Sequence, residues 1–234
     1  MFRGAQKVFL ETEGNFDCSI YPLVNAWGFY YNRLPDLIEI DSSRFINMLQ
    51  FIGFDKISLI NDSLVMPKGM SLDFNSIAQG FTVDLISDFL ESKGISNYLV
   101  EVGGEILAKG KNADRNIWRV GVDKPSDSID HKERFLFILD LEDKALATSG
   151  NYRKFYKKNG TKYSHTINPF TAFPAKNRLL SVSVVHDNCM LADAYATAFM
   201  TMGVKKTKHF IERQPEIEVY LVYTGKDGIW NSFI

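Results

Sequence analysis

Two oxygen-bearing side chains near the end of the sequence have the spacing of a metal site. Asp193 and Thr197 are four residues apart in a run of small and apolar residues, 191–202, that predicts a helix ended by Gly203. Side chains four residues apart lie on the same face of a helix. A carboxylate and a hydroxyl are hard oxygen ligands, and Mg²⁺ accepts them while keeping positions for phosphate oxygens and water. The alternative is that Asp193 complements the helix dipole and Thr197 fills the core.

A turn of small and polar residues precedes another predicted helix. Asp73 opens this run, 73–80, and apolar residues then recur at helical spacing from 81 to 93. The N-terminus of a helix presents unpaired N–H groups and a partial positive charge, and both attract phosphate. A buried strand is expected at 97–102, followed by Gly103-Gly104, which lets the backbone approach a neighbour or a ligand closely. The alternative is that the turn serves only as a helix cap.

A hairpin is predicted around Asn159 and Gly160, a residue pair that favours two-residue turns. Its second arm carries residues 163–168, Tyr-Ser-His-Thr-Ile-Asn, before Pro169 ends it. The imidazole of His165 titrates near neutral pH, so it is able to take a proton from a hydroxyl group. The alternative is a histidine that lies on the polar face of a hairpin arm and has no part in chemistry.

Together these segments resemble the ApbE family of FAD:protein FMN transferases. The corresponding blocks of this chain are, in order, YPLVNAWGF, DFNSIAQGFTVD, LVEVGGE, TSGNY, YSHTINPFTAFP and ADAYATA. The family patterns read approximately G-P-L-V-N-L-W-G-F, D-L-G-G-I-A-K-G-Y-A-V-D, L-V-N-L-G-G-D, T-S-G-D-Y, Y-S-H-I-I-D-P-x-T-G-x-P and A-D-A-x-A-T-A. The resemblance extends over nearly the whole chain. The clearest departure is Gln79, which stands where the family usually has lysine.

The resemblance implies an activity and a set of metal ligands. Members of this family cleave the pyrophosphate of FAD in a Mg²⁺-dependent phosphoryl transfer, attach FMN to a threonine hydroxyl of a target flavoprotein and release AMP. By the match of the blocks, Asp193, Thr197 and the backbone carbonyl of Ser76 are the metal ligands. His165 falls at the position of the proposed general base.

The resemblance also implies flavin-contacting positions. They are Asn15, Phe16, Asp17, Asp73, Gln79 and Ile167. Three of these, Asn15, Phe16 and Ile167, are equally compatible with core or turn positions.

The order of the predicted elements favours one α+β domain over residues 1–234. Strands and helices are interspersed without regular β-α alternation, which argues against a doubly wound sheet. The resemblance adds a T-fold-like architecture of two closely packed lobes with a flavin cleft between them. Family members usually carry a further segment before the block that starts near Gly14, so we expect the domain to be N-terminally incomplete.

Composition excludes several classes of function. With 45% hydrophobic residues the 234-residue chain can bury a substantial core. Lysine and arginine number 27 against 28 acidic residues, so there is no basic excess of the kind that nucleic-acid binding requires. The two cysteines, Cys18 and Cys189, form no C-x-x-C motif, so a thiolate metal site is not expected.

No stretch of the sequence is long and apolar enough to span a bilayer, and a soluble chain is expected. The resemblance implies that the parent protein is exported and lipid-anchored at the periplasmic face of the inner membrane. It also implies that the acceptor is a flavoprotein subunit of a membrane redox complex.

Two other functions remain compatible with the sequence. In an FAD pyrophosphatase, water would replace the threonine and the products would be free FMN and AMP. A non-catalytic FAD-binding protein would hold the flavin without turnover, and the change from lysine to Gln79 makes this alternative relevant. Release of AMP separates the binder from the two enzymes, and attachment of flavin to an acceptor separates the two enzymes from each other.

Overall fold

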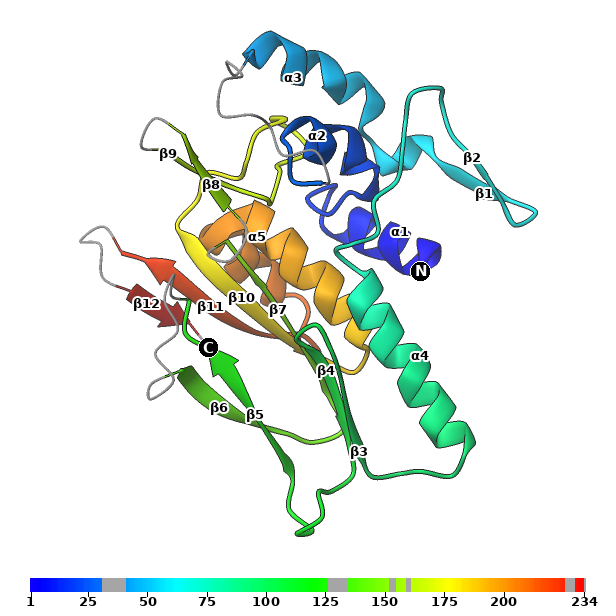
Figure 1. Ribbon diagram of the computed structural model, residues 1–234, viewed down its shortest axis with the longest axis vertical. Coiled ribbons are helices and arrows are strands. Elements are labelled where there is room, and N and C mark those ends of the chain that lie inside the picture. The colour runs from blue at the N-terminus through cyan, green and yellow to red at the C-terminus, as the bar shows by residue number, and fades with distance from the viewer. Residues whose placement is uncertain (31–40, 126–133, 152–154, 159–160, 226–229, 234) are drawn as a thin grey trace.

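A six-stranded antiparallel sheet lies in the middle of the molecule (Figure 1). The computed structural model describes residues 1–30, 41–125, 134–151, 155–158, 161–225 and 230–233. The strand order is β12-β11-β10-β7-β4-β3, and all neighbours are antiparallel. This sheet confirms the predicted α+β class, because a doubly wound fold is built on parallel strands. Its strands are β3 (Tyr98–Val102), β4 (Glu105–Lys109), β7 (Ala145–Gly150), β10 (Leu179–His186), β11 (Glu218–Thr224) and β12 (Trp230–Phe233).

The other described strands form two-stranded ribbons. The turn between β1 and β2 is made by Asn61 and Asp62, whose φ values of 46° and 61° suit a tight hairpin turn. The predicted turn at Asn159 and Gly160 lies outside the described residues. The ribbons pair β1 (Ser58–Ile60) with β2 (Ser63–Val65), β5 (Trp118–Asp123) with β6 (Phe135–Leu141), and β8 (Phe155–Lys158) with β9 (Thr161–Ser164).

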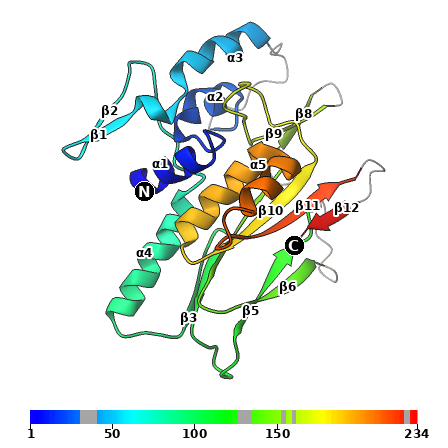
Figure 2. The same cartoon turned by 180° about the vertical axis from the view of Figure 1, so that it is seen from behind.

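Helices cover one face of the central sheet. The long helix α5 packs on β7 and β10, and α4 runs beside it and packs on β3 and β4 (Figures 1 and 2). The N-terminal helices and the β1–β2 ribbon lie at one end of these two. The α-helices are α1 (Phe2–Glu11), α2 (Tyr21–Ala26), α3 (Ser42–Met48), α4 (Ala78–Ser92) and α5 (Cys189–Ile211), and the short 3₁₀ helices are η1 (Cys18–Ile20), η2 (Leu49–Phe51) and η3 (Phe54–Lys56).

Neighbouring side chains of β10 show what covers each face of the sheet. Val184 is fully buried in the cluster that contains the apolar residues of α5. Val185, the next residue, packs in another cluster with Val120 and Val122 of β5 and Leu141 of β6. Successive side chains of a strand point to opposite faces. The β5–β6 ribbon therefore covers the face away from α5, and the molecule has three layers.

Helix α5 changes direction at Gly203. The φ and ψ values there are 76° and 169°, which are not helical, and residues on both sides continue as helix. The side-chain amide of Asn177 donates a hydrogen bond to the carbonyl of Met200 at 2.6 Å, close to this break. The sequence predicted that a helix over 191–202 ends at Gly203. The structure confirms this end as a kink between two helical segments of α5.

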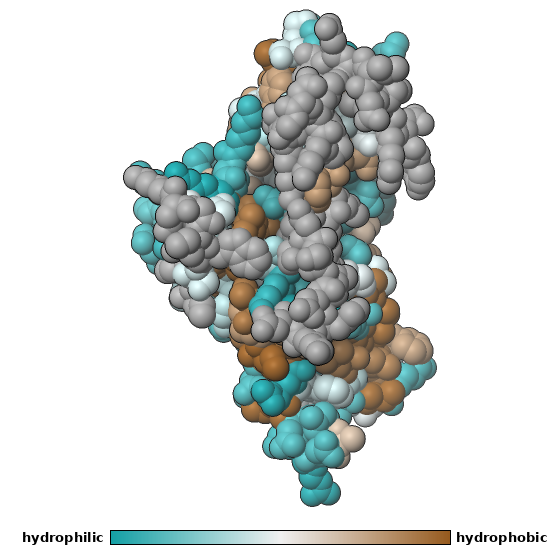
Figure 3. All heavy atoms as spheres, turned by 60° about the vertical axis from the view of Figure 1, so that its left-hand side comes forward, coloured by the Kyte–Doolittle hydropathy of each residue, from teal (hydrophilic) through white to brown (hydrophobic). Residues whose placement is uncertain are grey.

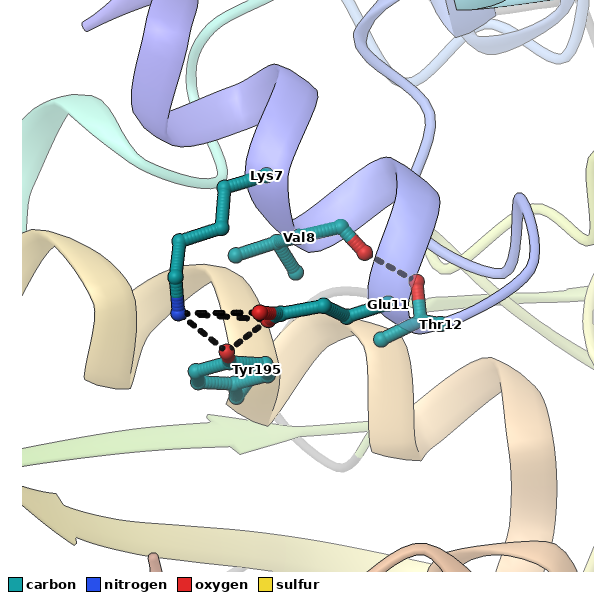
Figure 4. Close-up of polar contacts among 5 residues, drawn as sticks. All are labelled: Lys7, Val8, Glu11, Thr12 and Tyr195. Carbon is teal, nitrogen blue, oxygen red and sulfur yellow. Dashed lines mark hydrogen bonds and ion pairs between the residues drawn. The ribbon is translucent and has the colours of Figure 1, made fainter. Parts of the chain in front are cut away.

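Helix α1 is attached to α5 through Tyr195 (Figure 4). The Tyr195 hydroxyl donates a hydrogen bond to the Glu11 carboxylate. The Lys7 ammonium lies 3.1 Å from Glu11 Oε1 and donates to the Tyr195 oxygen at 3.3 Å. Further along the chain, the carbonyl of Asn15 accepts a hydrogen bond from Thr201 Oγ1 at 2.7 Å. These contacts hold α1 and the loop that follows it against α5.

The sequence predicted neither a thiolate metal site nor a membrane-spanning segment. Cys18 and Cys189 are both buried and free. Within the described ranges, no helix has both the length and the hydropathy needed to cross a bilayer.

Candidate active site

A cavity of about 1240 Å³ gathers residues from segments far apart in the sequence. Parts of the loop after α1, the turn before α4, the strand β7, the segment after β9 and one face of α5 all line it. The ten residues that the sequence suggested are all in its lining: Asn15, Phe16, Asp17, Asp73, Ser76, Gln79, His165, Ile167, Asp193 and Thr197. The structure thus brings the predicted positions to one space, and their roles remain predictions.

Asp193 is fixed by the start of α4. Its Oδ2 atom accepts a hydrogen bond from the backbone N–H of Gly80 at 3.1 Å. The two helices can come this close because residue 80 has no side chain, since a Cβ there would lie 2.3 Å from the carbonyl oxygen of Cys189. From the sequence, Gly80 is one of several small residues in a turn. The structure shows that it is the point where α4 and α5 come into contact.

A second contact runs in the opposite direction between the same helices. Both carboxylate oxygens of Asp84, on α4, accept hydrogen bonds from the backbone N–H groups of Cys189 and Met190, each at 2.9 Å. The carboxylate thus satisfies amides at the start of α5, which a helix cannot satisfy internally. The sequence pattern indicates no role for Asp84, although it is the last residue of the block DFNSIAQGFTVD.

The environment of Asp193 suits a bound cation. The residue is 5% exposed, and burial, followed by the nearby carboxylate of Glu105, raises the pKa of the Asp193 carboxyl to about 7. A cation would offset the cost of ionising this group. The described lining as a whole is acidic, with two arginines, Arg119 and Arg134, against six carboxylates: Asp17, Asp73, Glu101, Glu105, Asp123 and Asp193.

The other two predicted metal ligands are Ser76, in the turn before α4, and Thr197, on α5. Thr197 is one helical turn after Asp193, and its hydroxyl is 3.3 Å from the hydroxyl of Ser149. Ser76 is in the turn before α4 and also lines the cavity. No group of three or more His, Cys, Asp or Glu side chains in the described part of the chain has the arrangement of a metal site. The predicted ligand set has one carboxylate, one hydroxyl and one carbonyl, and these hard oxygens fit Mg²⁺.

The N-terminus of α4 has fewer available amides than the sequence suggested. The N–H of Ala78 donates to the carbonyl of Phe74 at 2.9 Å, and the N–H of Gly80 is used by Asp193. Two amides of the first turn are therefore already paired within the protein. A phosphate at this position would depend more on a cation and on side chains than on the helix N-terminus alone.

The loop after α1 has structural contacts of its own. Asp17 is the N-cap of η1 and accepts hydrogen bonds from Ser19 N at 2.7 Å and from Phe54 N at 3.3 Å. Burial raises the pKa of the Asp17 carboxyl. Phe16 is 1% exposed and belongs to the core cluster beneath α5. These residues both shape the loop and border the cavity.

Three further flavin-contacting candidates have distinct surroundings. The Asp73 carboxylate accepts a hydrogen bond from Asn75 N at 2.8 Å, so it orders the turn before α4. The side-chain amide of Gln79 lies against Gly103, where a Cβ would be 1.8 Å from Nε2. Ile167 is 5% exposed and packs in a cluster with Trp27.

His165 follows β9 and is half-buried at the cavity. Its ring lies edge-on to the ring of Phe29, with centroids 6.4 Å apart. Of the histidines given no role from the sequence, His186 accepts a hydrogen bond from Asn188 N, and His209 is exposed beside Glu212. His131 lies outside the described residues.

Comparison with known proteins decides the family. The family model described as "ApbE family" matches residues 1–221. The chain belongs to the ApbE family. ApbE relatives named "FAD:protein FMN transferase" include one from Vibrio cholerae, 38% identical over 221 residues, and one from Escherichia coli, 31% identical over 234 residues. These alignments cover 93% and 97% of this chain but 64% and 65% of the relatives, so the chain spans slightly less than two thirds of their length.

Solved ApbE structures have the same fold. The flavin transferase ApbE from Vibrio cholerae superposes with a TM-score of 0.87 and 35% identity, over 99% of this chain and 72% of that one. The apo form of the Pseudomonas stutzeri flavinyl transferase ApbE gives a TM-score of 0.84 and 30% identity, over 99% and 71%. These matches confirm the ApbE architecture expected from the sequence.

Proposed function

We propose that this chain carries the active site of an FAD:protein FMN transferase that needs Mg²⁺. The observation that carries the proposal is the buried Asp193 carboxylate, held by the Gly80 amide in an acidic cavity with room for a dinucleotide. ApbE relatives that match this chain are named "FAD:protein FMN transferase", which supports the transfer reaction. The proposed products are AMP and FMN attached to a threonine of a flavoprotein.

The ligands that we assign to Mg²⁺ are Asp193, Thr197 and the carbonyl of Ser76. When bound, the ion would neutralise negative charge on the pyrophosphate oxygens of FAD. The Gly80 amide orients the Asp193 carboxylate, and the contact between Thr197 and Ser149 orients the hydroxyl. We assign Asn15, Phe16, Asp17, Asp73, Gln79 and Ile167 to FAD because they line the same cavity.

His165 is the group that we assign to proton transfer. In the proposed step, the oxygen of the acceptor threonine forms a bond to the FMN phosphorus while the bond from that phosphorus to the AMP oxygen breaks. The threonine proton passes to a ring nitrogen of His165, and AMP leaves as the anion. Its position in the cavity lining supports this assignment.

The acceptor and the cellular location rest on the family resemblance. We propose a flavoprotein subunit of a membrane redox complex as the acceptor. The parent protein would be exported and lipid-anchored at the periplasmic face of the inner membrane.

Product analysis tests the proposed function. The chain is incubated with FAD and Mg²⁺, with and without an acceptor flavoprotein of a matching ApbE relative, and AMP, free FMN and protein-bound flavin are measured. The transferase predicts AMP and covalent flavin in equal amounts, both dependent on the acceptor. Free FMN and AMP without attachment would indicate a pyrophosphatase, and FAD binding without AMP would indicate a non-catalytic binder.

A further inference from the structure

Thr201 joins the helix that carries two predicted metal ligands to the loop that carries three predicted flavin contacts. Its Oγ1 atom donates a hydrogen bond to the backbone carbonyl of Asn15 at 2.7 Å. Both residues line the cavity, and they are 186 positions apart in the sequence. Thr201 lies beyond the block ADAYATA, so the sequence comparison gave it no role. The hydrogen bond sets the place of the loop against the helix at the wall of the cavity.

One face of α5 carries the metal ligands and the anchor of the loop. Asp193, Thr197 and Thr201 follow one another at intervals of four residues, and all three line the cavity. Four residues rise about 6 Å along an α-helix, so Thr201 lies about 12 Å beyond Asp193 along the helix axis. The helix is regular between them, since its break comes later, at Gly203. A regular helix holds the two metal ligands and the anchor at a fixed separation.

The loop around Asn15 depends on this anchor. Its neighbouring contacts are local: the side-chain amide of Asn15 donates to the carbonyl of Thr12 at 2.8 Å, and Phe16 N donates to Thr12 Oγ1 at 3.2 Å. Asn15 is 7% exposed, so its backbone carbonyl is shielded from water and is costly to leave without a donor. Removal of the Thr201 hydroxyl would therefore displace the loop, and the next two residues of the lining would move with it.

A second buried threonine on α5 gives a comparison. Thr207 is fully buried, and its hydroxyl has no hydrogen-bond partner among the described residues. Helix α5 thus accommodates a threonine whose hydroxyl makes no bond. At Thr201 the hydroxyl does bond, and it does so in the cavity lining, which favours a role in the site over a role as core filler.

We propose that Thr201 is a positioning residue for FAD, because its hydroxyl holds the loop 15–17 in register with the metal ligands on α5. It acts through the carbonyl of Asn15 and is not itself a metal ligand. The inference rests on the proposed function, which assigns the loop to FAD and the face of α5 to Mg²⁺. It requires that removing the hydroxyl weakens the binding of FAD without weakening the binding of the metal ion.

Separate measurements of FAD binding and metal binding test this inference. Thr201→Val removes the hydroxyl and keeps the shape of the side chain, and Thr201→Ser keeps the hydroxyl. Thr207→Val is the matched control on the same helix. FAD binding is measured by equilibrium dialysis with Mg²⁺ and no acceptor, where the proposed function predicts no turnover. We expect the Kd for FAD to rise about tenfold or more in Thr201→Val and to stay near the wild-type value in the other two.

The metal site is measured with Mn²⁺ alone, followed by electron paramagnetic resonance. Mn²⁺ accepts the same hard oxygen ligands as Mg²⁺. Because Asp193 and Thr197 are intact in every variant, the affinity for Mn²⁺ should be the same in all four proteins.

Adsorption of flavin to the outer surface has to be separated from binding in the cavity. Apolar surface gathers in the lower half of the face that Figure 3 displays, and a flavin ring could adsorb there. ADP has the adenosine and the pyrophosphate of FAD but no flavin ring. Only the bound FAD that excess ADP displaces is therefore counted.

The inference is wrong if folded Thr201→Val binds FAD as tightly as the wild type, or if its affinity for Mn²⁺ falls by the same factor as its affinity for FAD. It is also wrong if Thr201→Ser does not restore FAD binding. Circular dichroism checks folding, and Thr201→Ala, which also lacks the hydroxyl, replaces Thr201→Val if that variant does not fold. A wild type that binds no FAD displaced by ADP would overturn the proposed function and this inference with it, so the two failures are distinguishable.

Discussion

The Oδ2 atom of Asp193 lies 3.1 Å from the backbone nitrogen of Gly80, which donates a hydrogen bond to it. In the opposite direction, Asp84 of α4 accepts hydrogen bonds from the first amides of α5. Each helix thus supplies a carboxylate to the backbone of the other. This pairing fixes the rotamer of Asp193. If Asp193 holds the proposed metal ion, a carboxylate kept in one orientation by this hydrogen bond would bind the ion more tightly than a mobile one.

Replacing Asp193 by Asn should stabilise the chain in the absence of Mg²⁺. The carboxylate is 5% exposed and its pKa is raised to about 7, so ionising it at pH 8 costs folding energy. An amide keeps an oxygen for the Gly80 N–H without the charge. We expect the free energy of unfolding at pH 8 to rise by up to about 4 kcal/mol, measured by urea unfolding with a metal chelator present. A loss of stability would contradict the account.

Without Mg²⁺, the contribution of Asp193 to stability should decrease as the pH rises. Its carboxyl has a pKa of about 7 in the folded chain against an ordinary value of 3.8. Between these values the folded state binds the proton more tightly, so the stabilisation is complete below the ordinary value and is lost as the pH rises through 7. Between pH 5 and pH 8, the midpoint temperature of thermal unfolding should fall further for the wild type than for Asp193→Asn. An equal fall in the midpoint temperature for the two proteins would mean that the pKa of the Asp193 carboxyl is not raised.

Gly80→Ala should destabilise the chain strongly. Its Cβ would lie 2.3 Å from the carbonyl oxygen of Cys189, and this neighbour is backbone that cannot rotate away. Overpacking of this kind typically costs about 1–3 kcal/mol. The control is Leu85→Ala on the same helix, where the side chain is 51% exposed and a small effect is expected. The midpoints of urea unfolding measure both changes, and equal midpoints would argue against close helix contact at Gly80.

Tyr195→Phe tests the contact between α1 and α5. The substitution removes the hydroxyl that donates to Glu11 and accepts from Lys7, while the ring remains (Figure 4). A hydrogen bond to a charged group is worth about 1.5–3 kcal/mol, so thermal unfolding should occur at lower temperature. The Lys7→Met variant keeps the hydrogen bond between Tyr195 and Glu11, so its unfolding temperature should fall less than that of Tyr195→Phe. If Tyr195→Phe unfolds at the wild-type temperature, the contact does not hold the helices together.

The sequence predicted the elements that have local signals. Gly203 marks the end of the helix predicted over 191–202, because glycine readily adopts the positive φ value at which the helix breaks. The strands β4 and β7 were not predicted. Their first residues are buried without the alternation of a half-exposed strand, since helices cover one face of the sheet and the β5–β6 ribbon covers the other.

The candidate site was predicted through its sequence blocks, and its internal contacts were not. The structure brings all ten suggested residues to one cavity. The hydrogen bonds of Asp193 to Gly80 and of Asp84 to Cys189 join residues far apart in the sequence, so no local pattern indicates them. The charge of Glu105 acts on Asp193 across the fold for the same reason.

The most direct test of the central claim is AMP release from FAD by the wild type and by Asp193→Asn over a range of Mg²⁺ concentrations. The matched control is Asp187→Asn, which removes an exposed carboxylate paired with Lys144. We expect Mg²⁺-dependent AMP release from the wild type and the control, and at least a hundredfold lower rate from Asp193→Asn although it still folds. Equal rates for Asp193→Asn and the wild type would show that this carboxylate does not hold the metal.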